Sequence, residues 1–171
     1  LDRLFMGNIA KQVSEVRASG ARVAIVTSGA IFSGKKILGG NNGNEIRDQV
    51  YAAVGQRPII NAWGEEFDRY RINTGLFLFA ESDLDNPRLP LHEALNADIV
   101  PIINANDTVS VDEIRKLAIS ADNDRLASFV ARFLVDANKL ILLTEIDGDG
   151  ILNSDRETIE VIDCLDDLQK V

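Results

Sequence analysis

The stretch ARVAIVTSGAIFSGKKIL, residues 21–38, decides the fold class. Its first six residues, 21–26, form an apolar run that is typical of a buried strand. The segment TSGA, residues 27–30, contains a glycine and predicts a turn, and the residues after it predict a helix that continues through Leu38. A buried strand that passes through a short turn into a helix is typical of a parallel α/β sheet, because parallel strands are joined by helical crossovers.

The same alternation of strands and helices continues on both sides of this stretch. A near-3.6 apolar period predicts a helix from Leu1 to the helix stop at Gly20. Further helices are predicted at 45–54, 58–71, 88–97 and 122–136, and further strands at 75–80, 98–104 and 139–144. We expect a loop at 39–44, turns and a short hairpin within 105–121, and loop with short strand at the end. The pattern predicts a layered α/β fold with a mostly parallel sheet, in one domain over residues 1–171.

Composition excludes several classes of function. The 171 residues are 46% hydrophobic and 26% charged, which is ordinary for a globular protein. The net charge of −9, without a basic stripe, argues against binding to nucleic acid. No apolar run approaches the roughly 18 residues that a membrane span needs, and no leader pattern opens the sequence. We therefore expect a cytoplasmic protein with no membrane partner.

The chain contains a single cysteine and a single histidine, Cys164 and His92. One cysteine cannot form an internal disulfide or a cysteine-based zinc cluster. One histidine excludes a histidine-rich metal site, and its position in LPLHEAL indicates a helix-face or core role. We predict no metal-ligating protein residues and no Cys–His catalysis.

Polar or glycine-bearing segments follow three of the predicted strands. They are residues 27–30, 104–108 and 144–148, and the triplet 122–124 opens the helix just before the last of these strands. In open parallel sheets, ligands bind beyond the carboxyl ends of the strands. We therefore expect these four segments to lie near one edge of the sheet.

Each segment also has a purely structural interpretation. A tight turn with a capped helix would explain residues 27–30, an Asx-rich turn would explain 104–108, and a solvated loop would explain 144–148. The triplet Asp-Asn-Asp at 122–124 could cap a helix, but one N-cap explains only one of its three polar residues. The joint occurrence of the four segments at one predicted edge favours a functional site.

The residue types at this edge suit the binding of a charged small molecule. Ser28 and the N–H groups of a helix N-terminus can hold a carboxylate or a phosphate. Asp107 and Asn123 can accept hydrogen bonds from an ammonium group, and Asp124 could orient lysines. Phosphoryl transfer needs positioning and charge neutralisation, which suits a site without a usable histidine or cysteine. The nearby candidate cations are Lys35, Lys36 and Lys116, and none lies in a recognisable phosphate-binding loop.

Five colinear segments together resemble the glutamate 5-kinases of the amino-acid kinase family. They are VTSGAI (26–31), AAVGQ (52–56), PIINANDTVSVDEI (101–114), DNDRLA (122–127) and LILLTEIDG (140–148). The resemblance implies a three-layer α/β/α sandwich that uses ATP and Mg²⁺. The implied reaction phosphorylates the side-chain carboxylate of L-glutamate to glutamyl 5-phosphate, the first step of proline biosynthesis. It also implies a homo-oligomer.

The resemblance also implies roles for individual residues. Substrate-binding positions of the family fall on Ser28 with Gly29, on Asp107 and on Asn123. The aspartate that organises the catalytic lysines falls on Asp124, which leaves Asp122 to cap the helix. The pair that contacts the nucleotide falls on Thr144 and Glu145.

This sequence departs from the family pattern in ways that keep alternatives open. The family's first strand, with a phosphate-binding lysine, would precede Leu1, and a later glycine-rich segment with a second lysine would follow Val171. Glu145 stands where the family usually has aspartate. We therefore expect a domain that is incomplete at both ends. The alternatives are a kinase of another small carboxylate or carbamate, or a non-catalytic relative that binds an amino acid.

Overall fold

The computed structural model describes residues 2–40, 45–79, 88–108, 123–133, 137–143, 151–152 and 158–159. The chain separates into two units, Leu1–Leu140 and Ile141–Val171, and each is described by itself. The second unit contains an antiparallel pair formed by β4 (Ile151–Leu152) and β5 (Thr158–Ile159). A single domain over 1–171 stays a prediction. Residues 41–44 of the predicted loop 39–44 lie outside the described residues. So do residues 109–121 of the segment 105–121, in which turns and a short hairpin were predicted.

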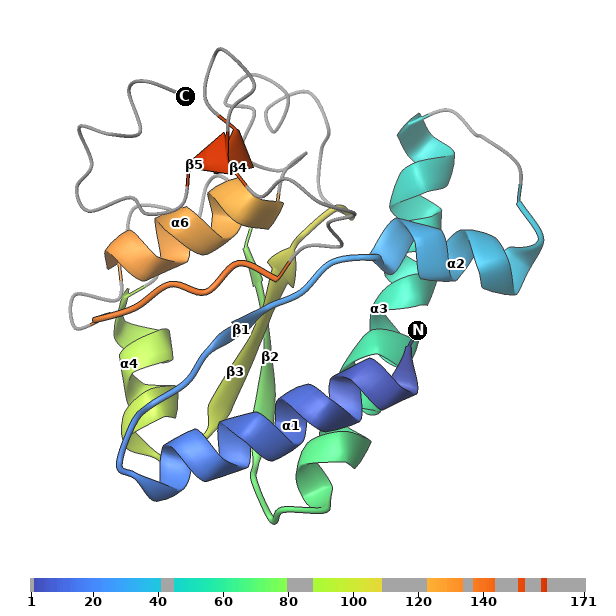
Figure 1. The fold of residues 1–171 in the computed structure, drawn as a ribbon. Coiled ribbons are helices and arrows are strands. Elements are labelled where there is room, and N and C mark those ends of the chain that lie inside the picture. The colour runs from blue at the N-terminus through green and yellow to red at the C-terminus, as the bar shows by residue number, and fades with distance from the viewer. Residues whose placement is uncertain are drawn as a thin grey trace. The chain divides into compact units, whose positions relative to one another are not determined.

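The first unit is built around a parallel sheet with the strand order β1-β3-β2 (Figure 1). Its elements in chain order are α1 (Arg3–Ala18), β1 (Ile25–Val26), α2 (Ala30–Leu38), α3 (Glu45–Asp68), β2 (Thr74–Phe79), α4 (Arg88–Asn96), β3 (Val100–Ala105) and α6 (Asn123–Phe133). Helices and parallel strands alternate, which confirms the predicted α/β class. Among the described helices, none combines the length and the apolar character that crossing a membrane requires.

The central strand β3 divides the core of the first unit into two clusters, because successive side chains of a strand point to opposite faces. Val100 and Ile102 belong to a cluster with residues of α1, α2 and α3. Ile103 and Ala105 belong to a second cluster with residues of α4 and α6. All six residues of β3 are buried. Helices thus cover both faces of the sheet, which confirms the three-layer α/β/α arrangement.

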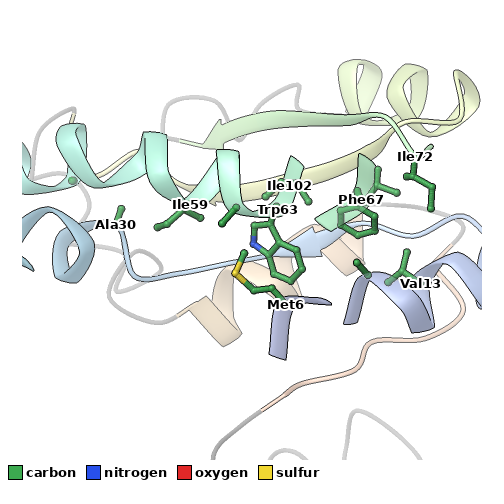
Figure 2. Packing of buried hydrophobic residues seen from close by; sticks show 12 residues of the cluster. Met6, Val13, Ala30, Ile59, Trp63, Phe67, Ile72 and Ile102 are labelled. Carbon is green, nitrogen blue, oxygen red and sulfur yellow. The ribbon is translucent and has the colours of Figure 1, made fainter. Parts of the chain in front are cut away.

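Helix α1 closes one face of the first cluster. The side chain of Asp2 caps it by accepting a hydrogen bond from the Phe5 N–H at 2.9 Å. Met6, Ala10 and Val13 form its buried stripe, at i, i+4 and i+7. Figure 2 shows Met6 next to the indole of Trp63 on α3. Of the residues whose apolar period predicted this helix, Val13 is buried, whereas Leu4, Phe5 and Val16 are exposed. The pattern therefore predicted the helix but not which side of it is buried.

Helix α3 is one continuous helix, so the prediction of two helices at 45–54 and 58–71 was wrong. Pro58 lies inside it, although an internal proline removes one backbone hydrogen bond and costs about 3 kcal/mol. The buried residues on either side of Pro58 keep one helical phase. They are Tyr51, Ala52, Gly55, Gln56, Ile59, Ala62, Trp63, Glu66 and Phe67. Burial of this unbroken face offsets the local penalty of the proline.

Two predicted strands differ from the observed structure. Strand β1 covers Ile25–Val26 and not 21–26, because Ile25 pairs with Ile102 and β3 begins only at Val100. Residues before Val23 therefore have no partner on β3. The predicted strand at 139–144 is wrong for its described part, since 139–143 form neither helix nor strand. An apolar run becomes a strand only where a neighbour supplies ladder hydrogen bonds. Among the residues that the structure describes, the three strands of this sheet pair only with one another.

Helices α2 and α3 cross in direct backbone contact. A Cβ atom added to Gly55 would lie 1.8 Å from the Ala30 carbonyl oxygen and 2.7 Å from the Gly34 nitrogen. A Cβ atom added to Gly34 would lie 1.9 Å from the Tyr51 carbonyl oxygen. Only glycine permits this approach, because any side chain would displace backbone and not merely a flexible neighbour. The crossing fixes the first turn of α2 against the middle of α3.

We predict that Gly55→Ala lowers the free energy of unfolding by about 2–3 kcal/mol, because the new methyl group would overlap the backbone of α2. Gly64→Ala on the same helix is the matched control. Its Cβ would meet only the Thr74 side-chain oxygen, at 3.9 Å. Removing a glycine from an open helix position should leave stability equal or higher, by up to about 1 kcal/mol. Urea unfolding of both variants measures this, and equal stability of the two would contradict the close crossing.

Candidate functional site

The carboxyl ends of β1, β3 and β2 lie at one edge of the sheet. The Thr27 N–H donates to the Ile103 carbonyl at 2.8 Å, and the Asn106 N–H donates to the Phe79 carbonyl at 2.8 Å. The polar segments that follow β1 and β3 therefore leave the sheet from neighbouring strands. The structure brings the predicted site residues Ser28 and Asp107 to this shared edge, where ligands of open α/β sheets bind.

Ser28 lies in the turn between β1 and α2 and is exposed. Gly29 follows it as the N-cap of α2 and has a left-handed backbone with φ of 94°. That conformation is strained for other residues, so glycine allows the chain to enter α2 directly after the strand. As a glycine, this N-cap has no side chain that could bond the first N–H groups of α2. The N–H groups of the first turn of α2 are thus adjacent to the Ser28 hydroxyl and suit a carboxylate or a phosphate.

Asp107 lies two residues after the end of β3 and is partly buried. Desolvation by this burial raises the pKa of the Asp107 carboxyl from 3.8 to about 6. A hydrogen bond from the Thr108 hydroxyl to the Asn106 side-chain oxygen, at 2.6 Å, closes the local turn. A poorly hydrated carboxylate binds a cation more favourably than a hydrated one, because less water must be removed. The N-terminus of α2, which follows β1, therefore suits an anion. The Asp107 carboxylate, which follows the neighbouring strand β3, suits a cation.

Two polar residues of α3, Gln56 and Trp63, reach the ends of these strands. The Trp63 indole N–H donates to the Thr27 hydroxyl at 3.3 Å, next to Ser28. The Gln56 amide bonds to Asn104 and to the Ala105 carbonyl, just before the turn that carries Asp107. Neither residue was predicted from the sequence to belong to the site. The available signal was that both fall on the buried face of α3, where a polar atom must find a partner.

The other predicted site residues lie on α6 or beyond it. Asn123 and Asp124 are the first two residues of α6, and Asp124 is exposed. Leu126 and Val130 anchor the helix in the cluster that contains Ile103. The predicted nucleotide contacts Thr144 and Glu145 lie outside the described residues.

The predicted cations lie in different surroundings. Lys35 pairs with Asp48 at 2.9 Å and lies over the Tyr51 ring, 5.7 Å from its centroid. This lysine therefore holds α2 to α3 and is not available as a phosphate ligand in this arrangement. Lys116 lies outside the described residues. Within the described ranges, no three His, Cys, Asp or Glu side chains gather as a possible metal site.

Comparison with known proteins identifies the family. A family profile described as the amino acid kinase family matches residues 2–169. Glutamate 5-kinase 2 of Pseudoalteromonas translucida is 38% identical over 183 aligned positions, which cover 100% of this chain and 48% of that protein. Glutamate 5-kinase of Geobacter sulfurreducens is 40% identical over 156 positions, which cover 86% of this chain and 40% of that protein. The chain thus spans about half the length of the curated relatives it matches, and it belongs to the amino acid kinase family.

Proposed function

We propose that the chain is the substrate-binding part of an ATP-dependent glutamate 5-kinase. The reaction transfers a phosphoryl group from ATP to the side-chain carboxylate of L-glutamate and yields glutamyl 5-phosphate, the first step of proline biosynthesis. One observation carries the proposal, namely that Ser28 and the desolvated Asp107 follow neighbouring parallel strands at one sheet edge. The relatives named glutamate 5-kinase support it.

The charges of L-glutamate match this edge. Its ammonium group would pair with Asp107, and Asn123 would accept a further N–H bond from it. A carboxylate of the substrate would bind to Ser28, Gly29 and the first-turn N–H groups of α2, where the helix dipole favours an anion. Pairing with the ammonium stabilises the charged form of Asp107 and lowers its pKa again.

Phosphoryl transfer then needs positioning and neutralisation of charge, not a protein nucleophile. We assign to Asp124 the orientation of lysines that neutralise the transferred group, and to Thr144 and Glu145 the contact with the nucleotide. Mg²⁺ would supply charge neutralisation and would be held chiefly by the phosphates of ATP. The proposal includes a cytoplasmic homo-oligomer without a nucleic-acid or membrane partner.

We predict that Asp107→Asn weakens L-glutamate binding by about 2 kcal/mol, or roughly 30-fold in Kd, because the charged partner of the ammonium is lost. Titration calorimetry at pH 7.5 measures the Kd, with L-aspartate as the control ligand. Asp68→Asn, at the exposed end of α3, is the control variant and should bind L-glutamate as the parent chain does. An unchanged Kd in Asp107→Asn would remove Asp107 from the site.

The raised pKa of Asp107, about 6, predicts a pH-dependent affinity. Only the ionised carboxylate pairs with the ammonium, so affinity is high above pH 6 and falls as pH drops through 6. The ionised fraction falls roughly tenfold between pH 7.5 and pH 5.0, and we expect the same factor in Kd. The Asp107→Asn variant should lose this dependence. Equal Kd values of the parent at both pH values would contradict the assigned role.

Kinase activity separates the proposal from the two alternatives. Glutamate-dependent release of ADP from Mg-ATP by the whole protein is expected. Binding of L-glutamate without ADP release would favour an amino-acid-binding relative. ADP release that depends on another carboxylate or on a carbamate would favour a family member with a different acceptor.

A further inference from the structure

Three buried groups form a closed ring of hydrogen bonds at the end of β3. The Ala105 N–H donates to the Asn104 side-chain oxygen at 2.9 Å. The Asn104 side-chain nitrogen donates to Gln56 Oε1 at 3.2 Å, and Gln56 Nε2 donates to the Ala105 carbonyl at 3.3 Å. Because a backbone N–H only donates and a carbonyl only accepts, the ring has one consistent direction and fixes the orientation of both amides.

The ring is almost free of solvent, with Asn104 2% and Gln56 7% exposed. A buried amide is unfavourable unless its hydrogen bonds are made, so breaking one member leaves the others unpaired. Two apolar side chains in place of Gln56 and Asn104 would fill the same space between α3 and β3 without the cost of unpaired buried amides. The ring therefore supplies something that packing alone does not, namely a defined position for the backbone of Ala105.

Ala105 is the last residue of β3, and Asp107 follows two positions later. The next residue, Asn106, is bonded to the end of β2 through its N–H. The turn that carries Asp107 is thus held by β2 on one side and by Gln56 of α3 on the other. Gly55, next to Gln56, touches the Ala30 carbonyl in the first turn of α2. One turn of α3 therefore contacts both strand exits that carry the candidate site.

We propose that Gln56 is a positioning residue, which sets the place of the Asp107 carboxylate through the ring with Asn104 and Ala105. The proposal rests on the proposed function, since it gives Gln56 a role in binding the substrate ammonium. We assign no substrate atom to Gln56, so its effect on binding is exerted only through the turn that carries Asp107.

A positioning role and a purely structural role predict different results. If the ring only adds stability, a folded variant without it should bind L-glutamate as tightly as the parent chain. If the ring positions Asp107, affinity falls even in the folded variant, because small displacements of a binding group are expensive. Local opening of the turn should then also appear in the backbone amides of Ala105 and Asn106.

Gln56→Met tests this, since methionine has a similar length and removes both hydrogen bonds. We expect about a tenfold loss of L-glutamate affinity at pH 7.5 and about tenfold faster amide exchange at Ala105 and Asn106. Phe67→Leu is the matched control, because it is a buried substitution at the other end of the same helix. It should lower stability without changing affinity or these two exchange rates.

Gln56→Glu is the second variant, in case the first does not fold. Glutamate keeps the shape and the acceptor for Asn104 but places an acceptor against the Ala105 carbonyl. This variant should therefore also bind L-glutamate more weakly and show faster amide exchange at Ala105 and Asn106. Unchanged affinity in folded variants of Gln56, with Asp107→Asn impaired, would overturn the positioning role. If the parent chain binds no L-glutamate, the proposed function has failed. In that case amide exchange alone tests whether the ring positions the turn. Unchanged exchange at Ala105 and Asn106 in the Gln56 variants would show that it does not.

Discussion

The backbone contact between α2 and α3 at Gly55 is the constraint on which the rest of the candidate site depends. It places the first turn of α2 against the middle of α3, with a separation that leaves no room for a Cβ atom. The entry into α2 carries Ser28 and Gly29, so their place is set by this crossing. The next residue of α3, Gln56, bonds to the end of β3. One turn of α3 thus sets the relative positions of the segments that follow β1 and β3.

The energetics of Asp107 follow from this rigid frame. A carboxylate on a free loop would turn into water and keep an ordinary pKa, whereas Asp107 is partly buried and its pKa is raised to about 6. An unfavourably hydrated charge lowers the stability of the empty site. The same loss of hydration would strengthen the proposed pairing with a substrate ammonium, so that a cost in the empty protein would become a contribution to binding.

The sequence alone predicted the elements whose signals are local. Helix α1, the strand-turn-helix pattern that leads into α2, and the buried strand β3 all depend on neighbours within a few residues. The buried stripe of α1 was not predicted, because Leu4 and Val16 of the apolar period are exposed. The sequence did not predict that α3 continues through Pro58. The helix continues because residues on both sides of the proline are buried on one face, which local sequence patterns do not show. The strand expected at 139–144 failed over 139–143, because an apolar run does not reveal whether a pairing partner is present.

The candidate site shows the same limit. Ser28 and Asp107 could be predicted to share an edge, since parallel strands end on one side of a sheet. Gln56 could not be connected to them, because its partner Asn104 is 48 residues away in the sequence. A glutamine on an apolar helix face signals only that some partner exists. Residues that hold a site together are therefore harder to find than residues that face the ligand.

The most direct test of the proposed pairing between Asp107 and the substrate ammonium is an NMR titration of the Asp107 side-chain carboxyl carbon, with and without L-glutamate. We expect a titration midpoint near pH 6 in the free protein, as the Asp107 pKa of about 6 requires, and a clearly lower midpoint with L-glutamate bound. A midpoint near the ordinary value of 3.8 in the free protein would contradict the desolvated site. A raised midpoint that L-glutamate does not change would contradict the pairing of Asp107 with the substrate ammonium.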